Sequence, residues 1–306
     1  MERRIFYFAL LVGTVSYAQP SPVFYWKLDA ASGSNAVAAV GGSDGTLVGG
    51  VLWDPAGGHH QGAARFDGVN DRIIVGACDL TNGGDAISLS LWIKPDFVTG
   101  MERTLIAKTI GPNAADHVWS IALVNATALR FRLKTGGITT ELSTPPSSLF
   151  GGTWYHMVAV YDGGEMRLYT NGSLMGAGPK SGSIGYHPQA PASLGATSTG
   201  TEPFSGWIDD VRVYDVALSD ADIIDILFES VTTAISDPSI ACSPATIQRL
   251  MIGYEELWLT DALGRTVLHR TINTSSGLEL PTLSAGIYLV CLQDHGTRTT
   301  ARMVVP

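Results

Sequence analysis

Alternating apolar and polar residues predict that this chain is built from β-strands. Residues 87–94 read ISLSLWIK, with isoleucines and leucines at every second position, which is the pattern of a strand with one face in a core. Residues 154–161 and 166–170 flank a Gly-containing turn at 162–164, so they predict a β-hairpin. Further strands are predicted at residues 23–29, 46–53, 104–108, 118–124, 129–134 and 193–195.

The closing strand of this series, within residues 206–218, carries a carboxylate on its apolar face. The alternation places Trp207, Val211 and Val213 on one side, and the same parity places Asp209 there. A carboxylate in that position needs a cation or several donors, because burial of an unpaired charge is costly. Two interpretations stay open: Asp209 is hydrogen-bonded to backbone or arginine groups, or it is a ligand of a structural calcium ion.

A second turn and a single helix complete the first part of the chain. The turn at residues 67–71 lies between the apolar runs 63–66 and 72–75, and we expect these runs to form a hairpin. Ser219 precedes residues 220–228, whose apolar positions repeat at helical spacing, so a short helix capped by Ser219 is predicted.

These elements show no β-α-β alternation, so the predicted fold class is all-β. Residues 19–231 are expected to form a two-sheet antiparallel jelly-roll sandwich. A polar linker, residues 232–246, separates it from a second unit at 247–306, predicted to be a small C-terminal β-sandwich. Its predicted strands are residues 257–259, 267–270, 277–280, 287–292 and 301–305.

The first residues have the pattern of a secretory signal peptide. Arg3 and Arg4 precede the apolar run 5–15, and small residues at 16–18 form a cleavage site, so residues 1–18 are predicted to be removed. The apolar run is too short to span a bilayer, and no later segment has the length of a transmembrane helix. The mature protein is therefore expected to be exported, without a membrane span.

The charge balance argues against two classes of partner. The formal net charge is −9, with 19 Lys and Arg against 28 Asp and Glu. It becomes −10 on loss of the signal peptide, which carries two positive residues and one negative residue. Nucleic acid and anionic membrane surfaces require a basic stripe, so neither is expected as a partner.

The three cysteines do not form a disulfide framework. Cys78 stands alone in the first domain, whereas Cys242 and Cys291 both lie in the last part of the chain. Two interpretations stay open: Cys242 and Cys291 pair in an oxidising compartment, or all three are buried thiols.

Five motifs in order now point to a family. Together they resemble the laminin-G-like, concanavalin-type jelly roll common in exported bacterial proteins. The resemblance covers nearly all of residues 23–227 and implies a curved sandwich, often with one calcium ion and a carbohydrate-binding or adhesive role. The motifs are FYWKLD (24–29), GAARFDGVNDRIIV (62–75), SLSLWIKP (88–95), WYHMVAVYDGGEMRLYTNG (154–172) and SGWIDDVRVYDVALS (205–219).

The second unit is similar to the C-terminal sorting domain of the type IX secretion system of Bacteroidota. DALGRTV at 261–267, LSAGIYLV at 283–290 and the last strand at 302–305 match that pattern. The usual Pro-Asn-Pro is replaced by Cys-Ser-Pro at 242–244, and the chain ends in Pro306 instead of a basic tail. The resemblance implies passage through the periplasm, then secretion or attachment to the outer-membrane surface. The alternative is a small β-sandwich that contributes only stability.

No catalytic site is predicted. Glucanases of this fold use carboxylates in an E-x-D-x-x-E pattern on one strand, and that pattern is absent. The pair Asp209 and Asp210 is expected to point to opposite faces of its strand. His59 and His60 are expected to be an exposed loop pair instead of a zinc site, and His156 a packed or edge histidine instead of a base.

For calcium, the candidate ligands are Asp29, Asp44 and Asp209. Asp29 ends the first predicted strand, and the first and last strands of a jelly roll commonly pair, so Asp29 and Asp209 are expected to meet at one end of a sheet. Backbone carbonyls of the Gly-rich loop would complete the shell. The alternative for each is a turn or capping carboxylate, and for Asp44 this alternative is preferred.

Carbohydrate binding requires aromatic faces for sugar C–H groups and polar groups for hydroxyls. Trp53, Trp119 and Tyr186 are the candidates, because they lie near predicted strand ends or loops. Each is alternatively a core aromatic. We therefore expect a non-catalytic module that binds a glycan or polysaccharide and is exported by the type IX machinery. The alternatives are an adhesive module that binds protein and, less favoured, a glycoside hydrolase.

Overall fold

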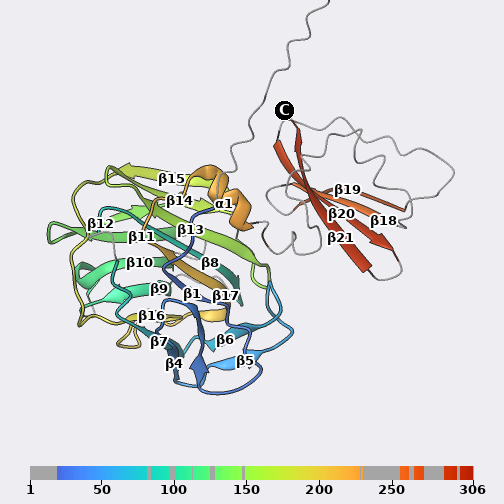
Figure 1. Ribbon diagram of the computed structural model, residues 1–306. Coiled ribbons are helices and arrows are strands. Elements are labelled where there is room, and N and C mark those ends of the chain that lie inside the picture. Colours follow the sequence, from blue (N-terminus) through green and yellow to red (C-terminus); the bar gives the residue numbers. More distant parts are fainter. Residues whose placement is uncertain are drawn as a thin grey trace, which may run out of the picture.

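The computed structural model shows a large β-sandwich and a small sheet (Figure 1). It describes residues 19–80, 84–96, 101–111, 113–124, 128–146, 149–227, 229, 256–261, 265–271, 286–294 and 297–305. The predicted signal peptide (1–18) and linker (232–246) lie outside the described residues, as does Cys242.

The first of two large sheets is antiparallel and has the order β15-β14-β13-β8-β17-β1-β3, with β6 paired to β17 and β5 paired to β6. The first and last strands, β1 and β17, are neighbours, as expected for a jelly roll. Its strands are β1 (Phe24–Trp26), β3 (Ala38–Val40), β5 (Leu52–Asp54), β6 (Ala63–Asp67), β8 (Ile87–Pro95), β13 (Tyr155–Tyr161), β14 (Glu165–Thr170), β15 (Ser173–Pro179) and β17 (Ser205–Tyr214).

The second large sheet has the order β12-β11-β10-β9-β16-β7-β4-β2 and is also antiparallel. Its strands are β2 (Asn35–Ala36), β4 (Gly45–Val48), β7 (Arg72–Gly76), β9 (Arg103–Thr109), β10 (His117–Val124), β11 (Ala128–Thr135), β12 (Ile138–Ser143) and β16 (Ala192–Leu194). A 3₁₀ turn, η1 (Ala114–Asp116), precedes β10.

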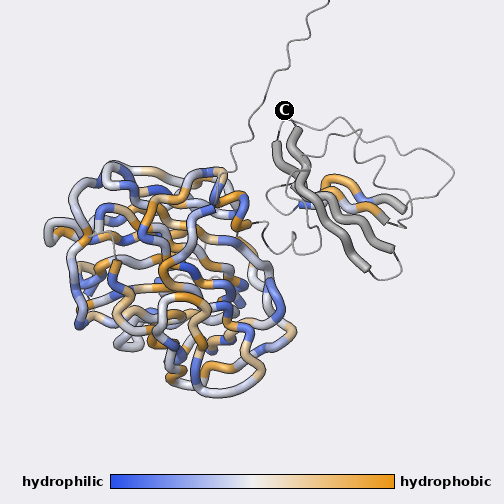
Figure 2. The backbone as a smooth tube through the Cα atoms, in the orientation of Figure 1, coloured by the Kyte–Doolittle hydropathy of each residue, from blue (hydrophilic) through white to orange (hydrophobic). Residues whose placement is uncertain are grey.

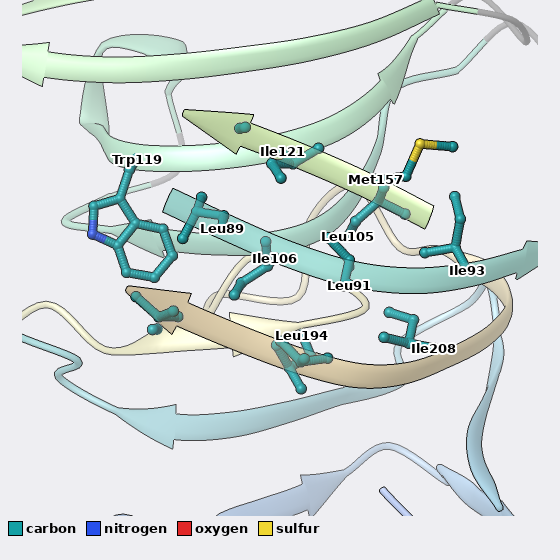
Figure 3. Packing of buried hydrophobic residues seen from close by; sticks show 14 of the residues in the cluster. Leu89, Leu91, Ile93, Leu105, Ile106, Trp119, Ile121, Met157, Leu194 and Ile208 are labelled. Atoms are coloured by element: carbon teal, nitrogen blue, oxygen red, sulfur yellow. The ribbon is translucent and has the colours of Figure 1, made fainter. Parts of the chain in front are cut away.

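Inward-facing aliphatic side chains from both sheets form one core. Leu89, Leu91 and Ile93 of β8 meet Leu105 and Ile106 of β9 in the same buried cluster (Figure 3). Burial of a large aliphatic side chain contributes about 1.5–3 kcal/mol, so this packing is the main stabilising term. Figure 2 shows apolar residues recurring along the strands of both sheets. The predicted all-β sandwich is confirmed.

A single helix, α1 (Asp220–Leu227), follows β17 and covers part of the outer face of the first sheet. Its start is a reciprocal cap: the Ser219 hydroxyl accepts the amide of Asp222 at 3.2 Å, and the Asp222 carboxylate accepts the amide of Ser219 at 2.8 Å. Ile223 and Ile226 pack against Val158 of β13 in a separate buried cluster. The predicted capped helix is confirmed.

The predicted hairpin around residues 67–71 is wrong. Its two arms form β6 and β7, but β6 pairs with β17 in the first sheet and β7 pairs with β4 and β16 in the second. The turn therefore crosses between layers. The predicted strand at 46–53 is similarly divided into β4 and β5, and Gly49, with φ of +97°, lies at the break.

A β-bulge changes the parity of β17. Asp209 lies opposite Trp92, and Arg212 lies opposite Ser90, so two residues of β17 occupy one position of β8. Asp210 has φ of +49°, which is typical of a bulge residue. The bulge lies where the neighbour of β17 changes from β6 to β1.

The C-terminal part forms a four-stranded antiparallel sheet with the order β19-β18-β20-β21. These strands are β18 (Glu256–Asp261), β19 (Thr266–Thr271), β20 (Gly286–Asp294) and β21 (Thr297–Val305). The turns at 262–264 and 283–285 and the strand predicted at 277–280 lie outside the described residues. Among the described residues, no helix is long and apolar enough to cross a membrane.

Candidate functional site

A cavity of about 170 Å³ lies between β9, β10 and two loops. We call it the Trp119 cavity. Its lining includes Asp79, Leu80, Lys108, Trp119, Ile184 and Tyr186. It thus combines aromatic and aliphatic surface with a carboxylate and an ammonium group.

The two loops are fixed by backbone contacts. The amide of Ile184 donates to the carbonyl of Gly84 at 2.8 Å, and Ile184 also forms an isolated bridge with Thr135. A Cβ on Gly84 would lie 2.4 Å from the Ile184 carbonyl oxygen, so this close approach requires glycine. The lining segment at 184–186 is therefore tied to Gly84, which also lines the cavity.

Lys108 is buried in the wall of the cavity, where its ammonium group has two partners. Its side chain is 2% exposed, and Nζ lies 2.8 Å from Oδ1 of Asp79 and donates to the carbonyl of Ala77. Because a buried charge is tolerated only when it is paired and hydrogen-bonded, this contact fixes the position of the Asp79 carboxylate at the cavity.

Cys78 lies beside this ion pair and is buried. Its backbone φ is +48°, and its thiol points to the carbonyl oxygen of Val75 at 3.6 Å. Burial raises the pKa of the Cys78 thiol to about 12. The thiol is therefore protonated and unreactive at neutral pH.

Trp119 is a core residue that also borders the cavity. It is 1% exposed, so its ring is not the open platform that the sequence suggested. Figure 3 shows it at the margin of the core cluster, with its ring nitrogen on the side away from the labelled aliphatic residues. Within the described residues Nε1 has no hydrogen-bond partner, which leaves a donor for a ligand.

The other two aromatic candidates lie in different places. Tyr186 is 73% exposed and belongs to the same cavity as Trp119. Trp53 is half-buried in β5 of the first sheet, and its Nε1 donates to the carbonyl of Gly33 at 2.8 Å. Trp53 is not among the residues that line the cavity.

Sequence reasoning missed the polar residues of the cavity, although one signal was present. Lys108 has the same strand parity as Ile106, which faces the core. A lysine at a core-facing position requires a buried acidic partner. Asp79, in a loop almost thirty residues earlier, could not be identified from sequence because only the fold brings it to Lys108.

The predicted calcium ligands Asp29 and Asp209 do approach each other. Oδ1 of Asp29 accepts the amide of Gly62 at 3.0 Å, and Oδ2 of Asp209 accepts the amide of His60 at 2.9 Å. Burial, with the charges of Asp210 and Asp29, raises the pKa of Asp209 to about 8. Burial also raises the pKa of Asp29.

The three predicted ligands are not assembled into one metal-holding group. Asp44 is exposed, and its Oδ1 accepts the amide of Ala38, the first residue of β3, at 2.9 Å. Within the described residues no group of three or more His, Cys, Asp or Glu side chains is arranged to hold a metal ion. Calcium binding through Asp29 and Asp209 stays a prediction.

The expected divergence of Asp209 and Asp210 is wrong, because of the bulge. Asp210 reaches the outer face of the sheet, where its carboxylate accepts hydrogen bonds from Tyr25 and contacts Nδ1 of His60. Burial alone would raise the pKa of Asp210, but His60 and the charge of Arg212 hold it below the ordinary value. Oδ1 of Asp209 is buried and has no hydrogen-bond partner among the described residues.

The expectation of an exposed histidine pair is also wrong. The His59 ring stacks on Trp92 at 3.4 Å between centroids, and His60 packs between His59 and Asp210. Burial lowers the pKa of His59 to about 3. The loop at 55–62 thus lies over the sheet, as a structural cover.

His156 is packed, as predicted. It is fully buried, Nε2 lies 2.8 Å from the Ser90 hydroxyl, and burial lowers its pKa to about 3. A neutral, enclosed imidazole does not contact the cavity.

Comparisons with known proteins agree with this architecture. The model of the concanavalin A-like lectin/glucanases superfamily matches residues 67–224. A search of curated proteins finds no match.

Solved structures with the same fold have low sequence identity to this chain. Domain 4 of AbnA, a GH43 extracellular arabinanase from Geobacillus stearothermophilus, in complex with arabinotriose, has a TM-score of 0.51 and 22% identity, with 69% of this chain and 100% of that chain covered. The binding domain of botulinum neurotoxin DC in complex with SialylT has a TM-score of 0.53 and 13% identity, with 92% and 73% covered. The same domain in complex with rat synaptotagmin II has a TM-score of 0.51 and 13% identity, also with 92% and 73% covered.

Proposed function

Because the chain belongs to the concanavalin A-like lectin/glucanases superfamily, we propose that it is an exported, non-catalytic module that binds carbohydrate in the Trp119 cavity. The observation that carries the proposal is the composition of this cavity, in which Trp119 and Tyr186 lie with the Asp79 carboxylate. The exposed Tyr186 ring can receive the C–H face of a sugar, and the Asp79 carboxylate can accept its hydroxyl hydrogens.

The structures of related fold support a glycan as the ligand class. The AbnA domain was solved with arabinotriose and a botulinum neurotoxin binding domain with SialylT. The same neurotoxin domain was also solved with rat synaptotagmin II, so a protein partner is the alternative. A glycoside hydrolase is the third possibility.

A glycan array probed with the purified full chain tests the proposal. Tyr186→Ala should weaken binding about twofold to tenfold, as expected for loss of an aromatic contact worth about 0.5–1.5 kcal/mol. Phe150→Ala is the matched control, because Phe150 is an aromatic residue with 66% exposure that does not line the cavity. Trp119→Phe keeps most of the core volume but removes the indole donor, and it should also weaken binding.

The outcomes separate the three classes. Binding without release of sugars, reduced by Tyr186→Ala, supports the lectin-like module. Release of sugars would overturn the non-catalytic assignment. Absence of binding to any glycan would overturn the assignment of the cavity and favour a protein partner. Equal binding by Tyr186→Ala and Phe150→Ala would also overturn it.

The proposal includes export by the type IX machinery through residues 247–306. The motifs at 261–267 and 283–290 and the four-stranded C-terminal sheet support a separate sorting unit. Deletion of residues 247–306 in the native host should cause accumulation in the periplasm. Unchanged appearance at the cell surface or in the medium would refute the sorting role and leave a structural domain.

A further inference from the structure

One row of side chains on the outer face of the first sheet forms an alternating stack of cations and aromatic rings. Arg65 of β6 lies opposite Trp207 of β17, and Trp207 lies opposite Lys94 of β8. Trp154, just before β13, is next to Lys94. All four side chains are half-buried. We call these four residues the Lys94 row.

The two cations of the row differ in how their charge is neutralised. The Arg65 guanidinium lies 4.3 Å from the Trp207 ring centroid and pairs with the Asp96 carboxylate at 2.6 Å. Lys94 Nζ lies 4.0 Å from the Trp207 centroid and 5.3 Å from the Trp154 centroid. Within the described residues Lys94 has no hydrogen bond or ion pair, so its three N–H donors remain available.

The nearby carboxylates are already engaged. Oδ2 of Asp54 accepts the indole N–H of Trp207 at 2.9 Å, and Oδ2 of Asp96 accepts both Arg65 and the Ser205 hydroxyl at 2.6 Å. These contacts hold Trp207 and Arg65 in place and leave Lys94 without an anion. In a chain of net charge −9, an ammonium group held between two indoles is a preorganised anion site.

The part of this face next to the row, around Trp92, is covered. His59 stacks on Trp92, and Leu227 and Ile224 of α1 pack with Trp92 and Trp154. Trp154 borders this cover, and the row runs from there toward Leu52 of the edge strand β5, which is 66% exposed. A ligand that reaches the Lys94 ammonium therefore also comes close to two half-buried indole rings.

We infer that the Lys94 row is a second binding site, separate from the Trp119 cavity, for a carboxylate-bearing polysaccharide. The carboxylate of a uronic acid unit would pair with the Lys94 ammonium, and the sugar ring would lie along the apolar indole edges. A neutral sugar would leave the ammonium unpaired.

Binding of the full chain to polygalacturonate and to its fully methyl-esterified form tests this inference. The free acid should bind at least tenfold more tightly than the ester, and the difference should shrink at high salt because the contact is ionic. Lys94→Gln should abolish the preference, whereas Lys94→Arg should retain part of it. Lys134→Gln is the matched control, because Lys134 carries the same charge in β11 of the second sheet and donates to the Ala115 carbonyl.

Each result decides the inference. Equal binding of acid and ester, no binding of either, or equal losses in Lys94→Gln and Lys134→Gln would overturn it. Unchanged melting temperatures of the variants would show that the fold is intact. Tyr186→Ala should leave polygalacturonate binding unchanged, so failure of the Trp119 cavity as a glycan site is distinguishable from failure of the Lys94 row.

Discussion

The Trp119 cavity and the outer face around Asp209 both contain buried charged groups, but the groups differ in whether they have partners. In the cavity wall, Lys108 has one carboxylate and one carbonyl as partners. On the outer face, Asp209 and Asp210 lie side by side, and Asp210 receives most of the available donors. Buried atoms without partners gather on this face, in His59, His60, His156, Asp209 and Arg212.

The comparison shows two effects of a buried charge. The ion pair of Lys108 and Asp79 fixes the positions of the groups around it, whereas Asp209, which has no cation as partner among the described residues, makes the free energy of unfolding depend on pH. A satisfied pair fixes the geometry of the groups around it. An unpaired buried carboxyl holds its proton instead, because the ionised form would be uncompensated. The cavity is therefore expected to be rigid near neutral pH, and the outer face to respond to proton concentration.

The largest effect is expected from breaking the completed pair. Asp79→Ala should lower the free energy of unfolding by about 3 kcal/mol, because Lys108 would stay buried without its carboxylate. Chemical denaturation of parent and variant measures the loss. The double variant Asp79→Ala/Lys108→Met removes both charges and should recover part of it. A double variant no more stable than Asp79→Ala would show that the ion pair is not the cause.

An opposite and smaller effect is expected at the incomplete site. The pKa of Asp209 is raised to about 8 in the folded state from 3.8. Between these values the unfolded state loses the proton and the folded state keeps it, so Asp209 makes stability fall as pH rises from 4 to 8. Asp209→Asn should therefore be more stable than the parent at pH 8, by about 2 kcal/mol, and close to it at pH 4. Melting curves at both pH values measure this, and exposed Asp44→Asn is the control.

The same variant decides the calcium prediction. If calcium binds Asp209, the ion would stabilise the folded parent by mass action. Chelation should then lower the parent's melting temperature, and Asp209→Asn should be less stable than the parent in calcium. If chelation has no effect and Asp209→Asn is stabilising, the ligand role is wrong.

The smallest effect concerns one hydrogen bond beneath the outer face. Ser90→Ala removes the hydroxyl that contacts Nε2 of buried His156, and it should cost about 1–2 kcal/mol. Nδ1 of His156 already has no hydrogen-bond partner among the described residues, so the ring would lose its hydrogen bond at Nε2 as well. A cost near zero in denaturation would show that the ring relaxes toward another partner.

Local patterns predicted the strands, the helix and the family well, because side-chain parity and turn residues act over short distances. The alternation at 87–94 became β8, and the hairpin at 154–170 became β13 and β14. The turn at 67–71 has the sequence of a hairpin turn, because a tight turn between two strands has the same residues whether the strands pair or enter different sheets.

The site was less predictable because its contacts join distant segments. A single bulge residue, Asp210, reversed the parity argument for Asp209, since one extra residue shifts every later side chain of a strand. The sequence places Trp119 near a strand end, whereas in the structure it is a core residue at a cavity wall. Pairings such as Lys108 with Asp79 depend on the assembled sandwich.

The buried thiol of Cys78 can report how often the wall of the Trp119 cavity opens. Its thiol is enclosed, and its pKa of about 12 suppresses the reactive thiolate at neutral pH. An alkylating reagent can therefore label Cys78 only during moments when the loop at 77–80 opens, and the labelling rate counts those openings. A glycan that occupies the cavity would slow this labelling, so occupancy becomes readable by mass spectrometry of the Cys78 peptide.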